Sequence, residues 1–402
     1  MMKNVRLVLN QDTFLWIKNK EGLVYQSKNY QAFTFTLSDS LFEICSYLLE
    51  IEHLYTVILS EELLSDTSVR YFVDQLIIID AGKLILDNDS TKDLVSLMPI
   101  IKIHDQIEDF IWKHEQGIGG KLILHIHELS FYINESKYGN DHYHKQFFFP
   151  CIDAPTLKSE KIIRFIRNSK NLHLSNINLI GNIFSYPTYT VLLNHIFNFE
   201  IPVTIYITFD DLVVHISQLK NIEWNNLVKF NILIDKISTI DKLSTLLNDI
   251  VVPYSITCLF FSENDIFDFE RIQTSFDIQM IPIFNGENIT FFESNVFVNK
   301  NDILSANLSK REVFMRQVTN VNHFGKLTIM TDGKVYSDVN QVSLGTIDDT
   351  PYSIVYKEFV EGKTWFRIRN QAPCNDCIFQ WLCPSPSNYE TVIGSQNLCF
   401  VK

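Results

Sequence analysis

Four of the seven cysteines of this chain lie between Pro373 and its last residue, Lys402. They are Cys374, Cys377, Cys383 and Cys399, with two, five and fifteen residues between successive members. Two cysteines separated by two residues can bind one metal from a single turn, and two further thiolates complete a set of four ligands. The spacing therefore predicts a metal site around which the C-terminal part of the chain folds.

The residues themselves leave the metal open. Four thiolates suit both Zn²⁺ and an iron–sulfur cluster, because both are soft enough for sulfur and accept tetrahedral ligation. A disulfide-bonded tail would need an oxidising compartment, and the sequence contains no targeting segment that would send the chain to one. Zinc and iron–sulfur are both favoured over disulfides.

The segments before the cysteines resemble a SPASM domain, the auxiliary [4Fe–4S] module at the C-terminus of peptide-modifying radical SAM enzymes. They are residues 324–337, 344–347, 354–359 and 365–370. The tail, residues 383–390 with 397–399, is more narrowly similar to the pseudo-radical-SAM proteins of Bacteroidota peptide-maturation systems with double-glycine leaders. SPASM-domain maturases of ATP-grasp-associated systems have a similar tail.

This resemblance implies one [4Fe–4S] cluster bound by Cys374, Cys377, Cys383 and Cys399, with Zn²⁺ as the alternative. Ser337 and Ser387 stand where many SPASM domains carry further cysteines, so we expect one cluster and not two. The resemblance also implies that Phe379 and Trp381 shield the cluster from water, and that Arg367 and Arg369 offset its negative charge. Surface ion pairs are the alternative role for the two arginines.

Composition limits the classes of protein that fit. A chain of 402 residues with 46% hydrophobic content has room for two or three domains with sizeable buried cores. Its net charge of −13 argues against binding to nucleic acid or to an anionic membrane. No run approaches the roughly 18 apolar residues that a membrane span needs, and the N-terminus lacks the apolar core of a signal peptide. We therefore expect a cytoplasmic protein.

Residues 1–88 are predicted to form a small α+β domain. Residues 14–17 and 23–25 flank a turn and suggest a hairpin, Asp39 could cap a helix whose apolar face includes Cys45, and a second helix begins near Ser68. Residues 80–87 suggest a wing strand. This order resembles the winged-helix leader-recognition domains of peptide-modifying enzymes, which bind a leader as an added strand. The alternative is a structural cap on the next domain, joined by a connector at residues 89–118.

Residues 119–305 alternate between strand-like and helix-like segments, which is typical of β/α units around a parallel sheet. The predicted strands are residues 121–127, 146–149, 177–180, 203–208, 228–234, 256–261 and 278–283, and the predicted helices include 160–168 and 241–249. The fold class is therefore α/β, and the count of units fits a partial (β/α)6 barrel. This architecture resembles the radical SAM core, in a degenerate form. Residues 306–402 would form the SPASM domain.

The predicted barrel lacks the residues of radical chemistry. A functional radical SAM core binds its cluster through a C-x3-C-x2-C loop, but the positions counted from Cys151 are Pro155 and Lys158. Ile183 stands where such cores carry the acid that binds the amine of the cofactor. We expect no S-adenosylmethionine and no catalytic residues. His125 and His127 are two residues apart, as are His142 and His144, so each pair would point to the same side of a strand and could bind a metal. Ordinary packing of these histidines is favoured.

The resemblance implies a non-radical partner in the maturation of a ribosomally synthesised, post-translationally modified peptide. Such a protein would bind the precursor peptide or a true radical SAM enzyme, or another maturation enzyme. One alternative is a maturase whose cluster contacts the peptide directly. The other is an interaction protein stabilised by zinc.

Overall fold

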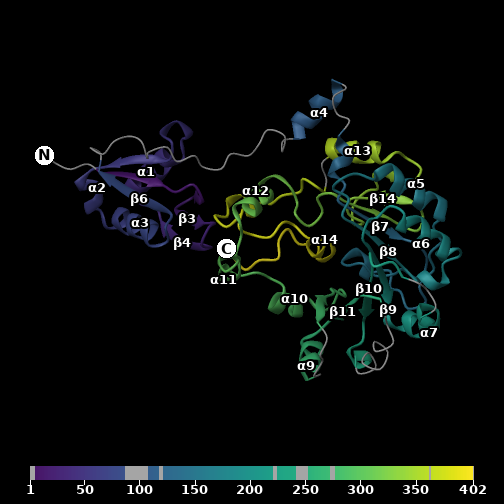
Figure 1. Cartoon of the computed structure of the whole chain (residues 1–402). Helices are drawn as coiled ribbons and strands as arrows, with labels where there is room; N and C mark the ends of the chain where they lie inside the picture. The colour runs from purple at the N-terminus through teal and green to yellow at the C-terminus, as the bar shows by residue number, and fades with distance from the viewer. Residues whose placement is uncertain are drawn as a thin grey trace.

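The computed structural model describes residues 5–86, 107–116, 121–220, 224–240, 252–271, 277–361 and 364–401. Three parts follow one another along the molecule: an N-terminal domain, a middle part that holds the C-terminal tail, and a large α/β part (Figure 1). The predicted helix at 241–249 and most of the connector lie outside the described residues. The helical end of the connector is α4 (Ile107–Glu115), and the ring of His114 in this helix contacts that of Tyr356 in α13 (Pro351–Glu361), with 3.8 Å between the ring centres.

Two antiparallel three-stranded sheets form the N-terminal domain. One has the order β5 (Thr56–Leu59), β1 (Val5–Leu9), β6 (Gly82–Leu86), and the other joins β2 (Thr13–Lys18), β3 (Glu21–Gln26) and β4 (Gln31–Thr36). The predicted hairpin is β2 and β3, and the predicted strand near residue 82 is β6, which pairs with β1. Strands β1, β4 and β5 were not predicted.

Helices α1 (Asp39–Leu49), α2 (Glu61–Ser65) and α3 (Thr67–Ile78) complete the N-terminal domain. The cap of α1 is Ser38 and not Asp39, because the Ser38 side chain accepts a hydrogen bond from the amide of Leu41. Cys45 is fully buried in the domain core, as its place on the apolar face of the helix predicts. Burial raises the pKa of its thiol to about 12, so the thiol stays protonated and serves packing.

A nine-stranded sheet organises the rest of the chain. Its order is β12-β11-β10-β9-β8-β7-β13-β14-β15, and its edges are β12 and β15. Strands β7 to β12 run parallel to their neighbours, β13 runs parallel to β7, and the last two strands are antiparallel. The strands are β7 (Glu128–Tyr132), β8 (Asn176–Ile180), β9 (Val203–Thr208), β10 (Val228–Ile234), β11 (Tyr254–Phe260), β12 (Ile278–Pro282), β13 (Lys326–Ile329), β14 (Lys334–Tyr336) and β15 (Gly345–Thr346).

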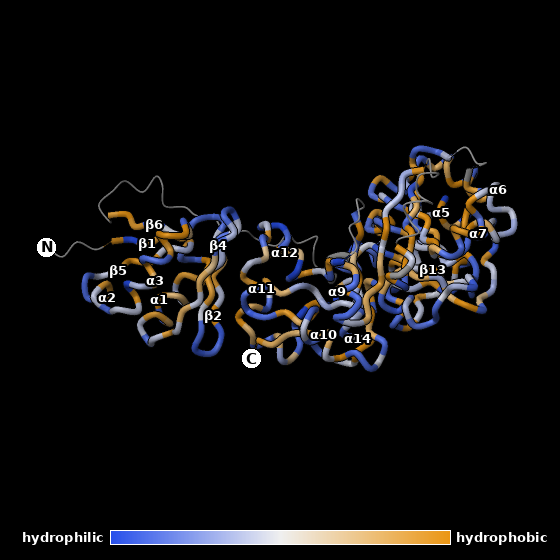
Figure 2. The backbone as a smooth tube through the Cα atoms, turned by 90° about the horizontal axis from the view of Figure 1, so that it is seen from below, coloured by the Kyte–Doolittle hydropathy of each residue, from blue (hydrophilic) through white to orange (hydrophobic). Residues whose placement is uncertain are grey.

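Hydrophobic side chains on one face of these strands pack beneath helices, and apolar segments converge on the sheet in Figure 2. The helices in this part are α5 (Ser159–Ser169), α6 (Tyr189–Phe197), α7 (Phe209–Lys220) and α9 (Glu263–Arg271). The middle part contains α10 (Ile289–Asn295), α11 (Lys300–Leu304), α12 (Lys310–Val318) and α14 (Asn388–Ile393). Because β13 pairs with β7, the sheet continues from residues 119–305 into the C-terminal part.

Two predicted strands are wrong. Residues 122–125 form a 3-10 helix, and the first strand of the sheet starts only at Glu128. Residues 146–149 are loop rather than strand, because both edges of β7 are already occupied, by β8 and by β13. The aromatic side chains of this loop pack against the sheet instead of pairing with it. Short apolar runs do not distinguish these alternatives.

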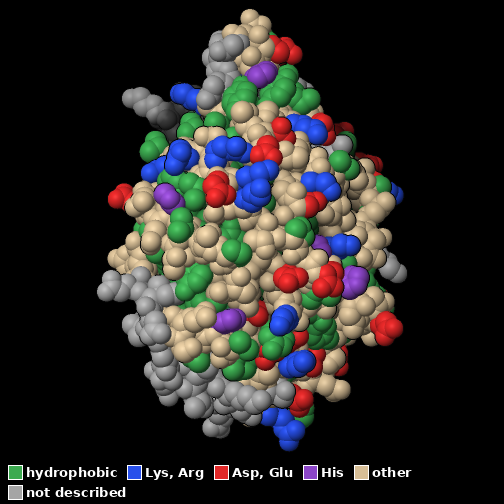
Figure 3. All heavy atoms as spheres, turned by 90° about the vertical axis from the view of Figure 1, so that its right-hand side faces the viewer, with side chains coloured by type: hydrophobic (Ala, Val, Ile, Leu, Met, Phe, Trp, Pro, Cys, Tyr) green, Lys and Arg blue, Asp and Glu red, His purple; other side chains and the backbone are tan. Residues whose placement is uncertain are grey.

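The surface at the right-hand side of Figure 1 shows basic and acidic side chains interspersed, with scattered hydrophobic ones (Figure 3). A face of this kind presents no extended field of one sign. In the part of the chain that the structure describes, no helix has both the length and the hydrophobicity to cross a bilayer.

Candidate cysteine site

The four cysteines of the tail lie in one neighbourhood. Cys374 begins a single 3-10 turn, Cys374–Asp376, and Cys377 follows it directly. Cys399 returns to the same region because its backbone forms a parallel bridge with Val298. Burial raises the pKa of Cys383 to about 11; Arg369 opposes this, while the other three cysteines add to it. The charges of the four sulfurs therefore influence one another.

The four sulfurs are not arranged around a single metal ion in the described structure. Among the residues described, no three His, Cys, Asp or Glu side chains are arranged as ligands of one metal ion. A zinc site would hold all four sulfurs at about 2.3 Å from one atom. The four sulfurs thus lie in one region of the described structure, but they do not surround a common point at the distance of zinc ligands. As a donor set, four thiols are the ligands that both zinc and a [4Fe–4S] cluster accept.

Several groups donate hydrogen bonds toward the sulfurs. The amide of Val401 lies 3.1 Å from Cys399 Sγ, and the amide of Phe379 bonds to the sulfur of Cys377. Cys374 Sγ has Arg369 Nη1 at 3.9 Å and Asn397 Nδ2 at 4.0 Å. Such N–H···S contacts stabilise the negative charge of thiolates and shift the potential of any cluster that they bind.

Two cations from distant parts of the sequence approach the cysteines. The Lys18 ammonium, at the end of β2, donates hydrogen bonds to the carbonyl of Asn375 and to Gln380 Oε1. Burial lowers the pKa of Lys18, and the nearby Cys377, Asp376 and Cys374 oppose that shift. Arg316 of α12 donates to the carbonyl of Leu382, and its charge interacts with Cys383.

The third cation, Arg369, belongs to the tail itself. Its guanidinium forms a buried ion pair with Glu390, with Nη2 and Oε1 at 2.7 Å, and Nε donates to the carbonyl of Pro384. Arg367 instead bonds to Thr391 at 2.9 Å and lies 4.0 Å from Glu390 Oε2. Of the two predicted arginines, the structure thus brings Arg369 to a sulfur and places Arg367 against α14.

The second face of the β2-β3-β4 sheet packs on the cysteine tail. One hydrophobic cluster combines side chains of the sheet, of α11 and α12, and of the tail, among them Phe14, Leu23, Tyr25, Val313, Phe379 and Cys383. Trp381 lies at its half-buried edge. The hydroxyl of Tyr25 donates to the carbonyl of Leu308 at 2.6 Å and accepts from its amide at 2.8 Å. The N-terminal domain and the tail therefore share a core.

Ser337 and Ser387, which stand where many SPASM domains carry cysteines, both form hydrogen bonds with glutamate side chains. Ser337 is buried and donates to Glu358 Oε2 at 2.8 Å, while the same carboxylate accepts from the amides of Thr364 and Trp365. The amide of Ser387 donates to Glu390 at the start of α14. Both positions thus hold the local fold together.

The loop around Cys151, where the sequence lacks the ligands of a radical site, is packed with the chain's own side chains. Cys151 is buried against Tyr132, Ile180 and Phe148, and burial raises the pKa of its thiol to about 12. Ile183 is also fully buried. A second cluster packs Phe149 against strands β10 and β11, with Tyr143 and Phe147 around it. Residues 143–151 therefore cover the carboxyl ends of the parallel strands with aromatic rings.

The paired histidines do not form a metal site in the described structure. His125 lies in the 3-10 helix rather than in a strand, and the ring of His127 lies 6.1 Å from that of His173. Burial lowers the pKa of His144, and its Nδ1 is buried without a hydrogen-bond partner. His125, His127 and His144 contact aromatic rings around β7, whereas His142 is exposed.

Sequence reasoning missed a polar network at the carboxyl ends of β8 and β9. Asp211 accepts hydrogen bonds from Thr208 Oγ1 at 2.8 Å, from Asn182 Nδ2 at 2.7 Å and from Ser136. The signal was present, because Asn182 and Asp211 each follow a predicted strand within a few residues. Asp211 is buried and its oxygens are occupied, so it ties the loops after β7 and β8 to the end of β9.

The sequence matches no protein-family model, and comparison with curated proteins finds no match. Two crystal structures of SuiB from Streptococcus suis are similar in chain course. SuiB bound to its precursor peptide SuiA has a TM-score of 0.45 and 12% identity, and SuiB bound to S-adenosylmethionine has 0.43 and 11%. In both cases 97% of each chain is covered. Likeness at this level carries no argument about chemistry.

Proposed function

We propose that this chain is a non-radical partner in the maturation of a ribosomally synthesised peptide. It binds one [4Fe–4S] cluster through Cys374, Cys377, Cys383 and Cys399, and it binds a precursor peptide or a true radical SAM enzyme, or another maturation enzyme. Residues 306–402 act as a SPASM domain, 119–305 as a degenerate barrel, and 1–88 as the leader-recognition domain. The observation that carries the proposal is the convergence of four thiols beneath Lys18, Arg316 and Arg369.

The resemblance of the tail to SPASM domains favours a cluster over zinc. The four thiols interact electrostatically, and a cubane would spread its four ligands over four irons. When bound, the cluster supplies a store for one electron. The three cations and the N–H···S contacts offset the charge of the four thiolates, and the cluster of Phe379 and Trp381 excludes water.

The filled barrel supports a non-radical role. The loop that follows β7 contains one cysteine, Cys151, and this thiol is buried and protonated. The aromatic side chains of residues 143–151 occupy the carboxyl ends of the strands, where α/β sheets usually bind ligands.

The N-terminal sheet offers an edge for a peptide. Strand β4 pairs with β3 along one side, and within the described residues no strand pairs with its other side. An extended leader could add there through main-chain hydrogen bonds. One face of the β2-β3-β4 sheet packs on the cysteine tail. A leader bound along the β4 edge of this sheet would therefore lie close to the cluster.

Anaerobic purification followed by analysis of iron, sulfide and zinc tests the cofactor. About four irons and four sulfides per chain are expected, together with no cleavage of S-adenosylmethionine after reduction. One zinc and no iron would instead establish the zinc-stabilised interaction protein. Cleavage of S-adenosylmethionine would overturn the non-radical role. Pull-down of short peptides encoded beside the gene, with a β4 edge variant Thr34→Pro as the negative control, tests the partner.

A further inference from the structure

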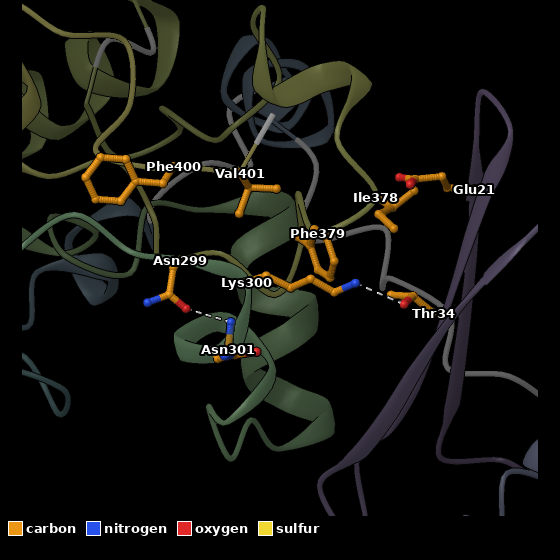
Figure 4. A pocket seen from close by; sticks show the side chains of 9 residues that line it. All are labelled: Glu21, Thr34, Asn299, Lys300, Asn301, Ile378, Phe379, Phe400 and Val401. Carbon is orange, nitrogen blue, oxygen red and sulfur yellow. Dashed lines mark hydrogen bonds between the residues drawn. The ribbon is translucent and has the colours of Figure 1, made fainter.

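A pocket of about 500 Å³ lies where the N-terminal sheet meets the cysteine tail. Its lining comes from three separate parts of the sequence: Glu21 and Thr34 from the sheet, Asn299 to Asn301 from the start of α11, and Ile378, Phe379, Phe400 and Val401 from the tail. Figure 4 shows these side chains around the central Lys300. The pocket is therefore a product of the docking between the two parts.

Lys300 is the cation of this pocket. Its ammonium lies 3.1 Å from Thr34 Oγ1 and 5.7 Å from the centre of the Phe379 ring. Glu21 stands on the same side of the pocket as Thr34, and in the described part of the chain no ion pair joins Glu21 to Lys300. A hydroxyl and an aromatic face orient the ammonium without neutralising it, so its charge is available to an anion.

The remaining walls suit a peptide better than a free inorganic anion. Ile378, Phe379, Phe400 and Val401 provide apolar surface, and the Phe400 side chain is about half exposed, at 54%. The side-chain oxygen of Asn299 accepts the amides of Asn301 and Asp302, which leaves its NH₂ group as a donor. An apolar wall with a few fixed polar groups is the usual composition of a ligand pocket, and this volume accommodates about three or four residues.

We propose that the pocket binds a short extended peptide segment carrying a carboxylate, which pairs with Lys300 while its neighbouring apolar side chain packs on Phe379 and Phe400. Thr34 lies on β4, so a segment that leaves the β4 edge can enter the pocket directly. This inference rests on the proposed function and names a subsite for the precursor. Ile378 follows Cys377 and Phe400 follows Cys399, so the bound segment lies beside two of the four proposed ligands.

Calorimetry on the full chain, purified without air, tests the subsite with two matched probes. The first is acetyl-Ala-Glu-Phe-Glu-amide and the second its isosteric partner acetyl-Ala-Gln-Phe-Gln-amide. The acidic peptide should bind at least about tenfold more tightly, because only it forms a charge-assisted bond with Lys300. Lys300→Met should remove that preference. Lys28→Met, which deletes the same charge at an exposed site outside the pocket, should retain it.

Location is tested separately by placing the photo-reactive p-benzoylphenylalanine at position 400, where the acidic peptide should be cross-linked. Equal binding of the two peptides, unchanged binding by Lys300→Met, or cross-linking only at other positions would each overturn the inference, as would no binding at all. Iron analysis of the same preparation separates the two ideas. A chain with its irons but without peptide discrimination loses the subsite alone, whereas an iron-free chain loses the proposed function.

Discussion

The Lys18 ammonium of the N-terminal domain donates a hydrogen bond to Gln380, three residues after Cys377. The same ammonium donates to the carbonyl of Asn375, between Cys374 and Cys377. One side chain thus joins the hairpin of the N-terminal domain to the loop that carries the first two proposed ligands. The relation between the two parts is electrostatic as well as hydrophobic.

Replacement of Lys18 by methionine should lower the reduction potential of the proposed cluster. Loss of a nearby positive charge weakens the binding of the added electron by about 1 kcal/mol at an effective dielectric constant of about 20, which corresponds to about 40 mV. A redox titration followed by electron paramagnetic resonance measures the shift. Lys28→Met should leave the potential in place, and equal potentials in both variants would refute the role of Lys18.

The cysteines should separate into two groups in iron analysis. Cys383→Ser is expected to reduce the content from about four irons per chain to below about one, because the proposed cubane would lose one of its four thiolate ligands. Cys45→Ala and Cys151→Ala should retain the full content, since both thiols are buried among apolar side chains. Loss of iron on replacing Cys151 would place a ligand in the barrel and contradict the assignment.

Arg369→Met should destabilise the C-terminal part by about 3–5 kcal/mol, because it leaves the buried Glu390 carboxylate without its partner. Arg367→Met is the matched control and should cost less than about 1 kcal/mol, because its guanidinium is more exposed and lies 4.0 Å from Glu390. Urea unfolding of the iron-loaded protein measures both. Similar losses of unfolding free energy in the two variants would show that the buried ion pair contributes no more to stability than the exposed contact of Arg367.

Glu358 predicts a pH dependence of stability. Burial raises its pKa above the value of 4.5 expected in the unfolded chain, although the amides of Trp365 and Thr364 and the hydroxyl of Ser337 oppose the shift. The folded state therefore binds more protons over this interval, and the stabilisation is complete below pH 4.5 and is lost as the pH rises through the folded pKa. Glu358→Gln should gain thermal stability relative to the parent chain between pH 5 and pH 8. A difference that stays constant or reverses would contradict this sign.

Sequence reasoning located what depends on local pattern. Strands β9 and β10 begin and end at the predicted residues, because runs such as Val203–Thr208 are rich in β-branched side chains and bury one face fully. The four cysteines were found by their spacing. The helix 159–169 was predicted to within one residue at each end.

Tertiary packing decided the rest. Lys18 and Arg316 are ordinary charged residues in the sequence, and only the docking of β2 and α12 brings them to the tail. Tyr25 and Leu308, which share two hydrogen bonds, are separated by 283 positions. The aromatic run at 146–149 was mistaken for a strand because its periodicity does not reveal that β7 has no free edge.

The Tyr25 bonds have a practical consequence for anyone dissecting this chain. A version that starts after residue 86 would lose the hydrogen bond from Tyr25 to the carbonyl of Leu308 and would expose the apolar surface formed by Val313 and Phe379. If such a truncated chain failed to bind a peptide, aggregation would explain the failure as well as loss of the binding site would. The N-terminal domain therefore cannot be exchanged alone. A chimera between homologous proteins would have to take the N-terminal domain and the cysteine tail from the same parent.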